Sequence, residues 1–133
     1  LTRAVRSAVA MAGIAPTAVT VVNAHGTGTR YNDMMELTAF KRIFRDQPLA
    51  LYSAKGALGH TLGAAGIIEA SLSVIGLAEQ IVPPTVGCQA AKALAQAWIQ
   101  QGPQRVAHDI AISTNSGFGG INAALVLTRG TLK

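Results

Sequence analysis

The sequence predicts a single layered α/β domain with a mixed sheet and a buried central helix. Segments with helical spacing alternate with short β-branched runs along the 133 residues, an order typical of layered α/β folds. The glycine-rich stretch "NSGFGG" joins the last two predicted strands, which favours a closing antiparallel hairpin. The run from His60 to about Glu79 is apolar on nearly every side, so we expect this helix in the centre of the structure.

The element boundaries follow from periodicity and from breaker residues. Apolar residues at helical spacing give the first helix, which Gly13 ends, and Asn32 or Asp33 can cap the second. Pro83 and Pro84 end the segment after the central helix. The predicted helices cover residues 2–12, 32–45, 60–79 and 90–99, with a loop at 100–104. The predicted strands cover residues 20–22, 49–55, 109–114 and 121–128.

Glycines recur around the start of the predicted central helix. Gly59, Gly63 and Gly66 follow one another at intervals of four and three residues. Because glycine has no Cβ atom, this spacing would allow another backbone to approach the helix closely.

Composition and charge narrow the class of protein. Half of the residues are hydrophobic and 13% are charged, which indicates a densely packed or partner-covered chain rather than a disordered one. A net charge of +5 can indicate nucleic-acid binding, but the basic residues are scattered and only one Trp, two Tyr and three Phe are present. An acidic protein partner would be attracted by the same charge, so we expect such a partner and no nucleic acid.

The cysteine content and the apolar runs bear on location. Cys88 alone can form neither an internal disulfide nor a thiolate metal cluster, which favours a reducing cytoplasm. No secretory signal opens the sequence, and the start at Leu1 indicates a fragment or a domain of a longer polypeptide. The most apolar run, 64–78, contains Glu69 and is shorter than the roughly 18 to 20 residues that span a bilayer, so we expect no membrane partner.

The stretch "NAHGTGT" places a histidine where a predicted strand ends. His25 is followed by Gly26, Thr27, Gly28 and Thr29, small residues that expose backbone and hydroxyl groups. Ligands in open α/β sheets bind at the carboxyl ends of strands. His25 is therefore either a catalytic group that faces a crevice or a histidine in a turn.

A second candidate cluster lies between the second strand and the central helix. Lys55 precedes His60 by five residues, and His60 is expected at the helix N-terminus. The partial positive charge of a helix N-terminus and the nearby lysine both favour neutral His60, which donates from one ring nitrogen and accepts at the other. The alternative is a capping histidine beside a surface lysine.

The third candidate is Phe118 within "NSGFGG". This side chain either covers the core or acts as a gate whose neighbouring backbone N–H groups bind an oxyanion. The glycine-rich stretches lack the spacing of dinucleotide- or phosphate-binding loops. His25, His60 and His108 are far apart in sequence, without an HExxH motif or a cysteine pair, so we expect no metal site.

The motifs "NAHGTGT", Lys55 with "GHTLGAAG", and "GFGGIN", in that order, closely resemble the C-terminal half of β-ketoacyl-acyl-carrier-protein synthases, the condensing enzymes of fatty acid and polyketide synthesis. The resemblance extends from about Leu1 to about Thr128. It implies one half of a thiolase-like duplicated α/β sandwich, with residues 1–133 as the ketosynthase C-terminal domain. It also implies a 3-oxoacyl-[acyl-carrier-protein] synthase, an acyltransferase that condenses a malonyl-carrier-protein thioester with an acyl thioester, with loss of carbon dioxide. The substrates would be carried on the phosphopantetheine of an acyl carrier protein, and no separate cofactor is expected.

The resemblance assigns a role to each matching residue. His25 and His60 would hydrogen-bond the thioester carbonyl oxygen of the malonyl unit and stabilise the enolate that decarboxylation leaves. Lys55 would orient the second histidine, and Glu69 would help to hold this network. The remaining assignments are Thr27, Thr29 and Gly119 as pantetheine-binding residues, and Phe118 as the gate whose backbone N–H helps to form an oxyanion hole.

Several positions depart from the family's pattern. The family's nucleophile is a cysteine in the N-terminal half, and Cys88, in the loop after "VPPT", does not occupy that position. The stretch Arg30, Tyr31 and Asn32 stands where the family usually has a proline, often a leucine or alanine, and a glycine or asparagine. Ile121 stands where threonine is usual. Arg30 would place a charge at the mouth of the substrate channel and affect which carrier or substrate enters.

Three functions compete on this sequence. The leading hypothesis is the decarboxylation half of a condensing enzyme that needs a cysteine-bearing N-terminal half, as a subunit or as part of the same polypeptide, and that is dimeric when complete. This chain would be inactive alone. The first alternative is a non-catalytic partner subunit similar to chain-length factors, which would not need two imidazoles at one crevice. A thiolase-type enzyme would be expected to carry a cysteine base where this chain has "SGFGG".

Overall fold

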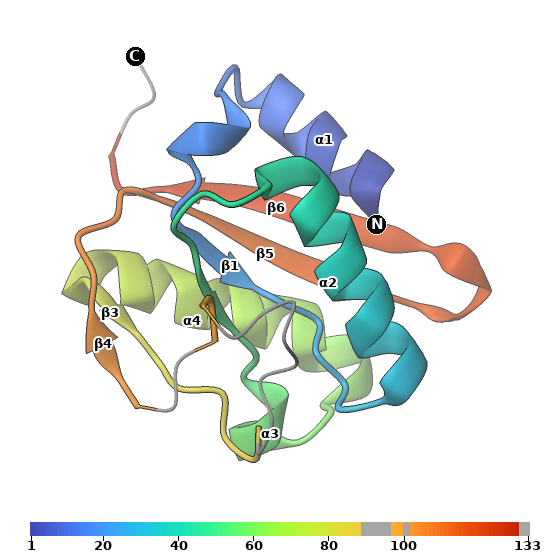
Figure 1. Cartoon of the computed structure of the whole chain (residues 1–133). Helices are drawn as coiled ribbons and strands as arrows, with labels where there is room; N and C mark the ends of the chain where they lie inside the picture. The colour runs from blue at the N-terminus through green and yellow to red at the C-terminus, as the bar shows by residue number, and fades with distance from the viewer. Residues whose placement is uncertain (89–96, 100–101, 131–133) are drawn as a thin grey trace.

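One mixed four-stranded sheet organises the chain. The computed structural model describes residues 1–88, 97–99 and 102–130 (Figure 1). The strands lie in the order β2-β1-β5-β6, in which β1 is parallel to both neighbours and β6 is antiparallel to β5. The predicted hairpin is thus confirmed. The strand bounds are β1 Val21–Asn23, β2 Ala50–Tyr52, β5 Ile110–Ser116 and β6 Asn122–Thr128.

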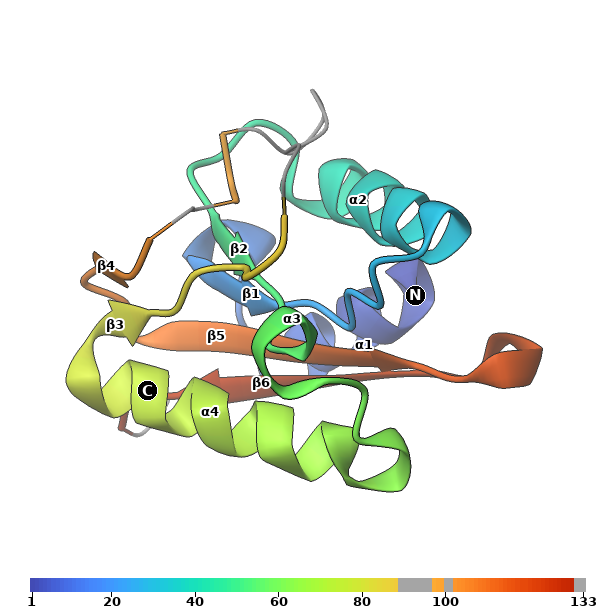
Figure 2. The ribbon, with the colours of Figure 1, turned by 90° about the horizontal axis from the view of Figure 1, so that it is seen from below.

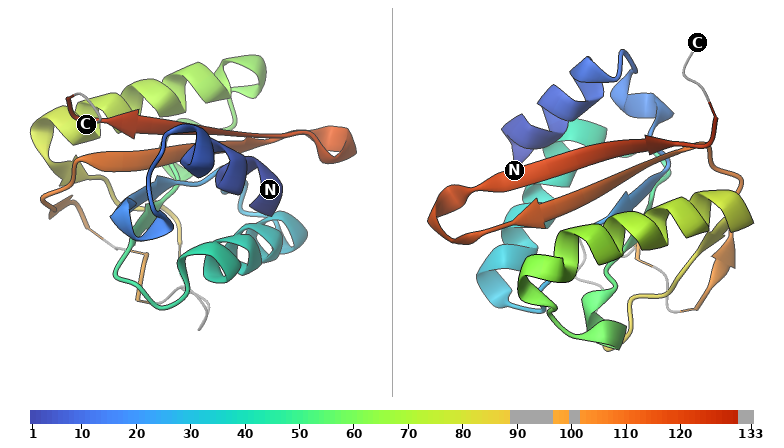
Figure 3. Two further views of the ribbon diagram at one scale, coloured as in Figure 1. Left: turned by 90° about the horizontal axis from the view of Figure 1, so that it is seen from above. Right: turned by 180° about the vertical axis from the view of Figure 1, so that it is seen from behind.

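Helices cover both faces of this sheet. Helices α1 (Thr2–Met11) and α2 (Arg30–Phe44) lie on one face, and α4 (Ala65–Glu79) lies on the other (Figures 2 and 3). The arrangement confirms the predicted α/β layers. The described residues also form four short helical segments: η1 Pro16–Ala18, α3 Lys55–Leu58, η2 Leu62–Ala64 and η3 Phe118–Gly120.

The sheet has a hydrophobic core on each face because its strands alternate sides. Val22 belongs to the larger core, which includes Phe40 and Phe44 of α2. Its neighbour Val21 belongs to the second core, with Tyr52 and with Leu77 of α4. Burial of each such large side chain contributes about 1.5–3 kcal/mol. The two cores fix the carboxyl ends of β1 and β2, where the candidate residues lie.

The central helical segment differs from the prediction. Instead of one helix from His60, the chain forms α3, then η2, then α4 from Ala65. Gly59 has a φ of 77° and Leu62 a φ of 50°, values that interrupt a right-handed helix. His60 therefore lies in the loop before the helix, and the expected helix N-terminus at this residue is wrong.

Helix α4 is also less buried than expected. Its buried residues Ala65, Glu69, Ser73 and Leu77 form a single stripe, while the opposite face exposes Ile67, Val74 and Ile75. The 18 residues Leu62–Glu79 have a mean hydropathy of 1.5, and 22% of them are buried, so by length and composition this segment could cross a membrane. The core helix of a larger protein has the same length and composition, and the inward carboxylate of Glu69 favours that interpretation.

Other element boundaries also differ from the predicted ones. Helix α2 begins at Arg30 after an extended Thr29, so neither Asn32 nor Asp33 is its cap. A two-stranded antiparallel sheet, β3 (Ile81–Val82) with β4 (Gln104–Arg105), was not predicted because two-residue strands carry no periodic pattern. The predicted helix 90–99 falls mostly outside the described residues.

Candidate active site

The site is built where β1 and β2 end. Asn23, the last residue of β1, is fully buried, and its Nδ2 donates to the Glu69 carbonyl at 2.9 Å and to Ser73 Oγ at 3.1 Å. These two bonds tie the strand end to the inner face of α4. His25 follows two residues later and is 5% exposed.

The structure brings the two predicted histidines together. The rings of His25 and His60 lie edge to face, with centroids 5.3 Å apart and planes at 82°. The Leu62 backbone N–H donates to His60 Nδ1 at 3.1 Å. Because Nδ1 accepts, the neutral ring carries its proton on Nε2, which leaves that nitrogen as a donor toward a ligand.

Lys55 is buried rather than on the surface. It is 8% exposed, and its Nζ donates to Oε1 of Glu69, which is 2% exposed. Burial first, then the Lys55 ammonium and then His60, lower the pKa of His25 from 6.5 to about 4. His25 is consequently neutral near pH 7, so the lysine supports the neutral form of the first histidine, whereas the sequence suggested the second.

Glu36 of α2 holds the backbone that carries His25. Its Oε1 accepts from the His25 N–H at 2.8 Å, and its Oε2 accepts from the Gly26 N–H at 2.7 Å and from Asn32 Nδ2 at 2.9 Å. Burial raises the pKa of Glu36 even though these three donors oppose the shift. The carboxylate fixes the loop from the side opposite to Lys55 and α4.

Gly26 is required at its position. Its φ is 43°, and a Cβ there would lie 2.5 Å from Ser53 Cβ, at the end of β2. Ser53 Oγ donates to the Gly26 carbonyl at 2.9 Å. The two strand ends therefore meet through a contact that only glycine permits.

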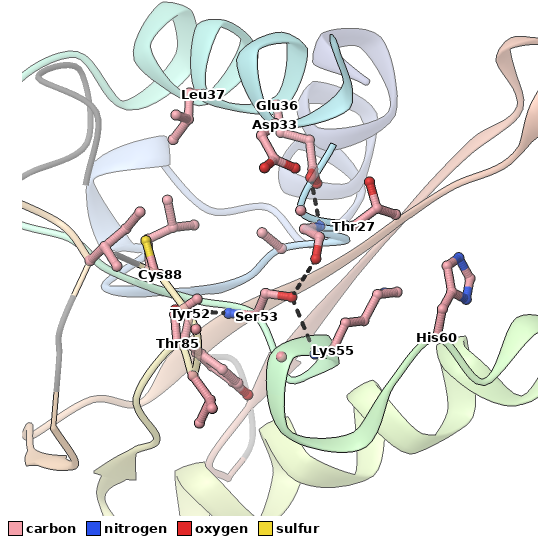
Figure 4. Close-up of a pocket in the computed structure, with 18 of the residues that line it drawn as sticks. Thr27, Asp33, Glu36, Leu37, Tyr52, Ser53, Lys55, His60, Thr85 and Cys88 are labelled. Carbon is pink, nitrogen blue, oxygen red and sulfur yellow. Dashed lines mark hydrogen bonds between the residues drawn. The ribbon is translucent and has the colours of Figure 1, made fainter. Parts of the chain in front are cut away.

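A cavity of about 530 Å³ opens beside these residues (Figure 4). Of the predicted site residues, Thr27, Lys55 and His60 line it, and Arg30 lies on the same wall. Cys88 also lines the cavity, but Figure 4 shows it and His60 on opposite sides. Thr29 is exposed and shares a 2.8 Å hydroxyl hydrogen bond with Thr27.

The structure does not bring the glycine-rich hairpin to this cavity. Phe118 is 104% exposed at the tip between β5 and β6, and Gly119 beside it is exposed as well. Neither residue lines the cavity. Within the described residues no group of three metal-ligating side chains gathers, which leaves the hairpin and cavity without a candidate metal centre.

Comparison with known proteins identifies the family. Residues 1–89 match the family described as "Beta-ketoacyl synthase, C-terminal domain". The chain belongs to the beta-ketoacyl synthase family. The chain is 35% identical over 123 residues to "3-oxoacyl-[acyl-carrier-protein] synthase 2" of Mycobacterium leprae (strain TN), which covers 92% of this chain and 29% of that protein. It is 38% identical over 134 residues to "Granaticin polyketide putative beta-ketoacyl synthase 1" of Streptomyces violaceoruber, covering 97% and 31%.

Solved ketosynthases share the fold as well. One is the complex described as "AntDE:AntF (apo): type II PKS acyl-carrier protein in complex with its ketosynthase bound to the hexaketide". It superposes with a TM-score of 0.91 at 28% identity, over 98% of this chain and 33% of that chain. This beta-ketoacyl synthase chain thus spans about a third of the length of the proteins that it matches, and the α/β layers seen here are those of a ketosynthase.

Several site residues carry no sequence signal of their own. Glu36 lies in the middle of an amphipathic helix, and its two backbone partners come from the preceding loop. Asn23 belongs to the motif "NAHGTGT", but its hydrogen-bond partners on α4 lie 46 and 50 residues away in the sequence. Asn115 donates to Glu69 from the far end of β5. Only the strand-end positions of Asn23 and Asn115 could have suggested them.

Proposed function

We propose that this chain supplies the decarboxylation half of a condensing enzyme that joins a malonyl-carrier-protein thioester to an acyl thioester. The observation that carries the proposal is the contact between the His25 and His60 rings beside buried Lys55. Two imidazoles at one crevice, of which His25 is neutral, suit a reaction that develops negative charge on a carbonyl oxygen. The curated relatives are named as enzymes of this class.

The chemistry follows from the ring nitrogens. When the malonyl thioester loses carbon dioxide, the electrons of the broken C–C bond form an enolate whose charge rests on the thioester oxygen. His60 Nε2 would donate to that oxygen, and neutral His25 would supply the second donor. The enolate carbon then attacks the acyl thioester on the nucleophilic cysteine, a C–C bond forms, the C–S bond breaks, and the cysteine leaves as thiolate.

The cysteine and the partners belong to the larger enzyme. We assign the nucleophile to an N-terminal half, because Cys88 lies across the cavity from His60. Thr27 and Thr29 would contact the pantetheine arm of an acyl carrier protein, and Phe118 with Gly119 would reach the site once the other half packs against the hairpin. Substrates would arrive bound to the carrier, so the chain needs no cofactor of its own. A dimeric, cytoplasmic enzyme fits this proposal.

The test is a reconstitution. The chain mixed with a cysteine-bearing half should release carbon dioxide from malonyl carrier protein and form the 3-oxoacyl product, whereas either part alone should not. A matched mixture in which the nucleophilic cysteine is replaced by serine should lose condensation. If His25→Ala leaves carbon dioxide release unchanged, the chain is a non-catalytic partner similar to chain-length factors, and the proposal fails.

A further inference from the structure

The two carboxylate oxygens of Glu69 on α4 accept hydrogen bonds from different elements, one from Lys55 of α3 and one from Asn115 of β5. Oε1 accepts from Lys55 Nζ, and Oε2 accepts from Asn115 Nδ2 at 2.5 Å. Glu69 is 2% exposed, so water does not replace either partner. The carboxylate is therefore held between α3 and β5, and both of its bonds depend on protein donors.

The Asn115 amide has a fixed orientation. Its Nδ2 also donates to the Thr114 carbonyl at 2.7 Å, so both amide hydrogens are used on oxygen acceptors. Its Oδ1 points at α4, where a Cβ on Gly66 would stand only 2.7 Å away. Gly66 and Glu69 are three residues apart on one helix face. Glycine at 66 thus admits the Asn115 amide against the helix beside the carboxylate.

An amide suits this position better than the alternatives. A carboxylate at 115 would face the Glu69 carboxylate with like charge, and an alanine would leave Oε2 without a donor in a dry site. Other titratable groups near Glu69 are Lys55 from α3 and the Tyr52 phenol from β2, which bonds Ser73 at 3.3 Å. Among the residues that the structure describes, Asn115 is the one whose side chain donates to Oε2 of Glu69.

We propose that Asn115 is a positioning residue for the catalytic lysine: by holding Oε2 of Glu69 it fixes the carboxylate that keeps the Lys55 ammonium beside the histidine pair. Asn115 touches no reacting atom and acts through Glu69 and Lys55. The inference rests on the proposed decarboxylation. It adds β5 to the elements that position Lys55 beside His25 and His60.

The role predicts a chemical effect besides a structural one. Lys55 is the second cause of the low pKa of His25, after burial. If loss of Asn115 lets Glu69 and Lys55 shift, the pKa of His25 should rise above about 4. Because catalysis needs neutral His25, the acidic limb of the pH–rate profile should move to higher pH by the same amount.

The experiment compares three variants of the complete enzyme, meaning this chain together with its cysteine-bearing half. Asn115→Ala removes the donor, and Gly66→Ala crowds the amide without altering Asn115, Glu69 or Lys55. Gly63→Ala is the matched control, because a Cβ there meets nothing within 4 Å in the part of the chain that the structure describes. Carbon dioxide release from malonyl carrier protein is measured across pH, and the His25 titration is followed by NMR with ¹³C-labelled histidine.

Asn115→Ala and Gly66→Ala should each slow decarboxylation about 10- to 100-fold, as displaced catalytic groups do, and should raise the His25 pKa, while Gly63→Ala changes neither. An unchanged rate and titration in both variants would overturn the proposal. A rate loss without any shift of the His25 titration would reduce Asn115 to a structural residue and also overturn it. If the unaltered enzyme releases no carbon dioxide, the proposed function fails, and the His25 titration still decides the role of Asn115. Should Asn115→Ala not fold, Gly66→Ala gives the same test.

Discussion

Glu36→Gln tests whether the buried carboxylate of α2 holds the His25 loop. The carboxylate accepts from two consecutive backbone N–H groups, one on each oxygen, at 2.8 and 2.7 Å. Glutamine has nearly the same shape but only one oxygen. Its NH₂ group would face one of these N–H donors, so at least one backbone hydrogen bond is lost.

The size of the effect follows from that loss. A hydrogen bond to a charged group contributes about 1.5–3 kcal/mol. Removal of the buried charge offsets part of this, because burial raises the pKa of Glu36 and thus disfavours its carboxylate. The net cost should be about 1–2 kcal/mol, which corresponds to roughly 5- to 30-fold faster local opening of the loop.

Amide hydrogen exchange measures this opening directly. In the complete enzyme, the amides of His25 and Gly26 should exchange about 5- to 30-fold faster in Glu36→Gln. Glu79→Gln, at the exposed end of α4, is the matched control and should change nothing there. If the His25 and Gly26 amides exchange as slowly in Glu36→Gln as in Glu79→Gln, the Glu36 carboxylate does not hold the His25 loop.

The pH dependence has a definite sign. Because the pKa of Glu36 is higher in the folded chain than its usual 4.5, the folded state holds the proton more tightly. Its contribution to stability is full below about pH 4.5 and declines as pH rises through the folded-state value. The cost of Glu36→Gln should therefore be largest in acid and smaller near neutral pH, and the opposite trend would contradict the burial argument.

Three further outcomes follow from the same structure. The chain alone should self-associate through the exposed apolar face of α4, and Ile75→Lys should reduce this in sedimentation experiments; a monomer at high concentration would count against that face. Affinity for an acidic carrier protein should fall as the salt concentration rises, because salt screens the attraction between the partner and the net charge of +5. A salt-independent affinity would show that this charge does not contribute to binding. Gly26→Ala should lower the melting temperature more than Gly28→Ala: both residues have positive φ, which costs about 1–2 kcal/mol, but only Gly26 meets Ser53. Equal losses would show that the Ser53 contact does not matter.

Much of the fold could be predicted because its signals are local. The β-branched run near Val21 and the hairpin glycines lie within the elements that they specify, and those elements appear within a few residues of their predicted places. The break between α3 and α4 was missed because it depends on the positive φ of Gly59 and of Leu62, and a positive φ at a leucine cannot be read from the sequence. The exposed face of α4 was missed because an apolar sequence does not say which partner covers it.

The residues of the candidate site also differ in whether a local sequence signal identifies them. His25, Lys55 and His60 could be named because they stand in short ordered motifs, and the structure places them together. Glu36 and Asn115 could not be named, because their roles depend on partners 10, 11 and 46 residues away. The roles of Thr27, Thr29, Phe118 and Gly119 stay predictions, since they concern groups that this chain does not carry.

The most direct measurement is carbon dioxide release by the complete enzyme carrying His60→Ala. The variant removes the ring whose Nε2 is left as a donor by the Leu62 contact, and loss of one such donor typically costs about 10²–10³-fold in rate. Release from malonyl carrier protein should fall by at least about 100-fold while the folded structure persists. Undiminished release would contradict the assignment of the histidine pair to decarboxylation.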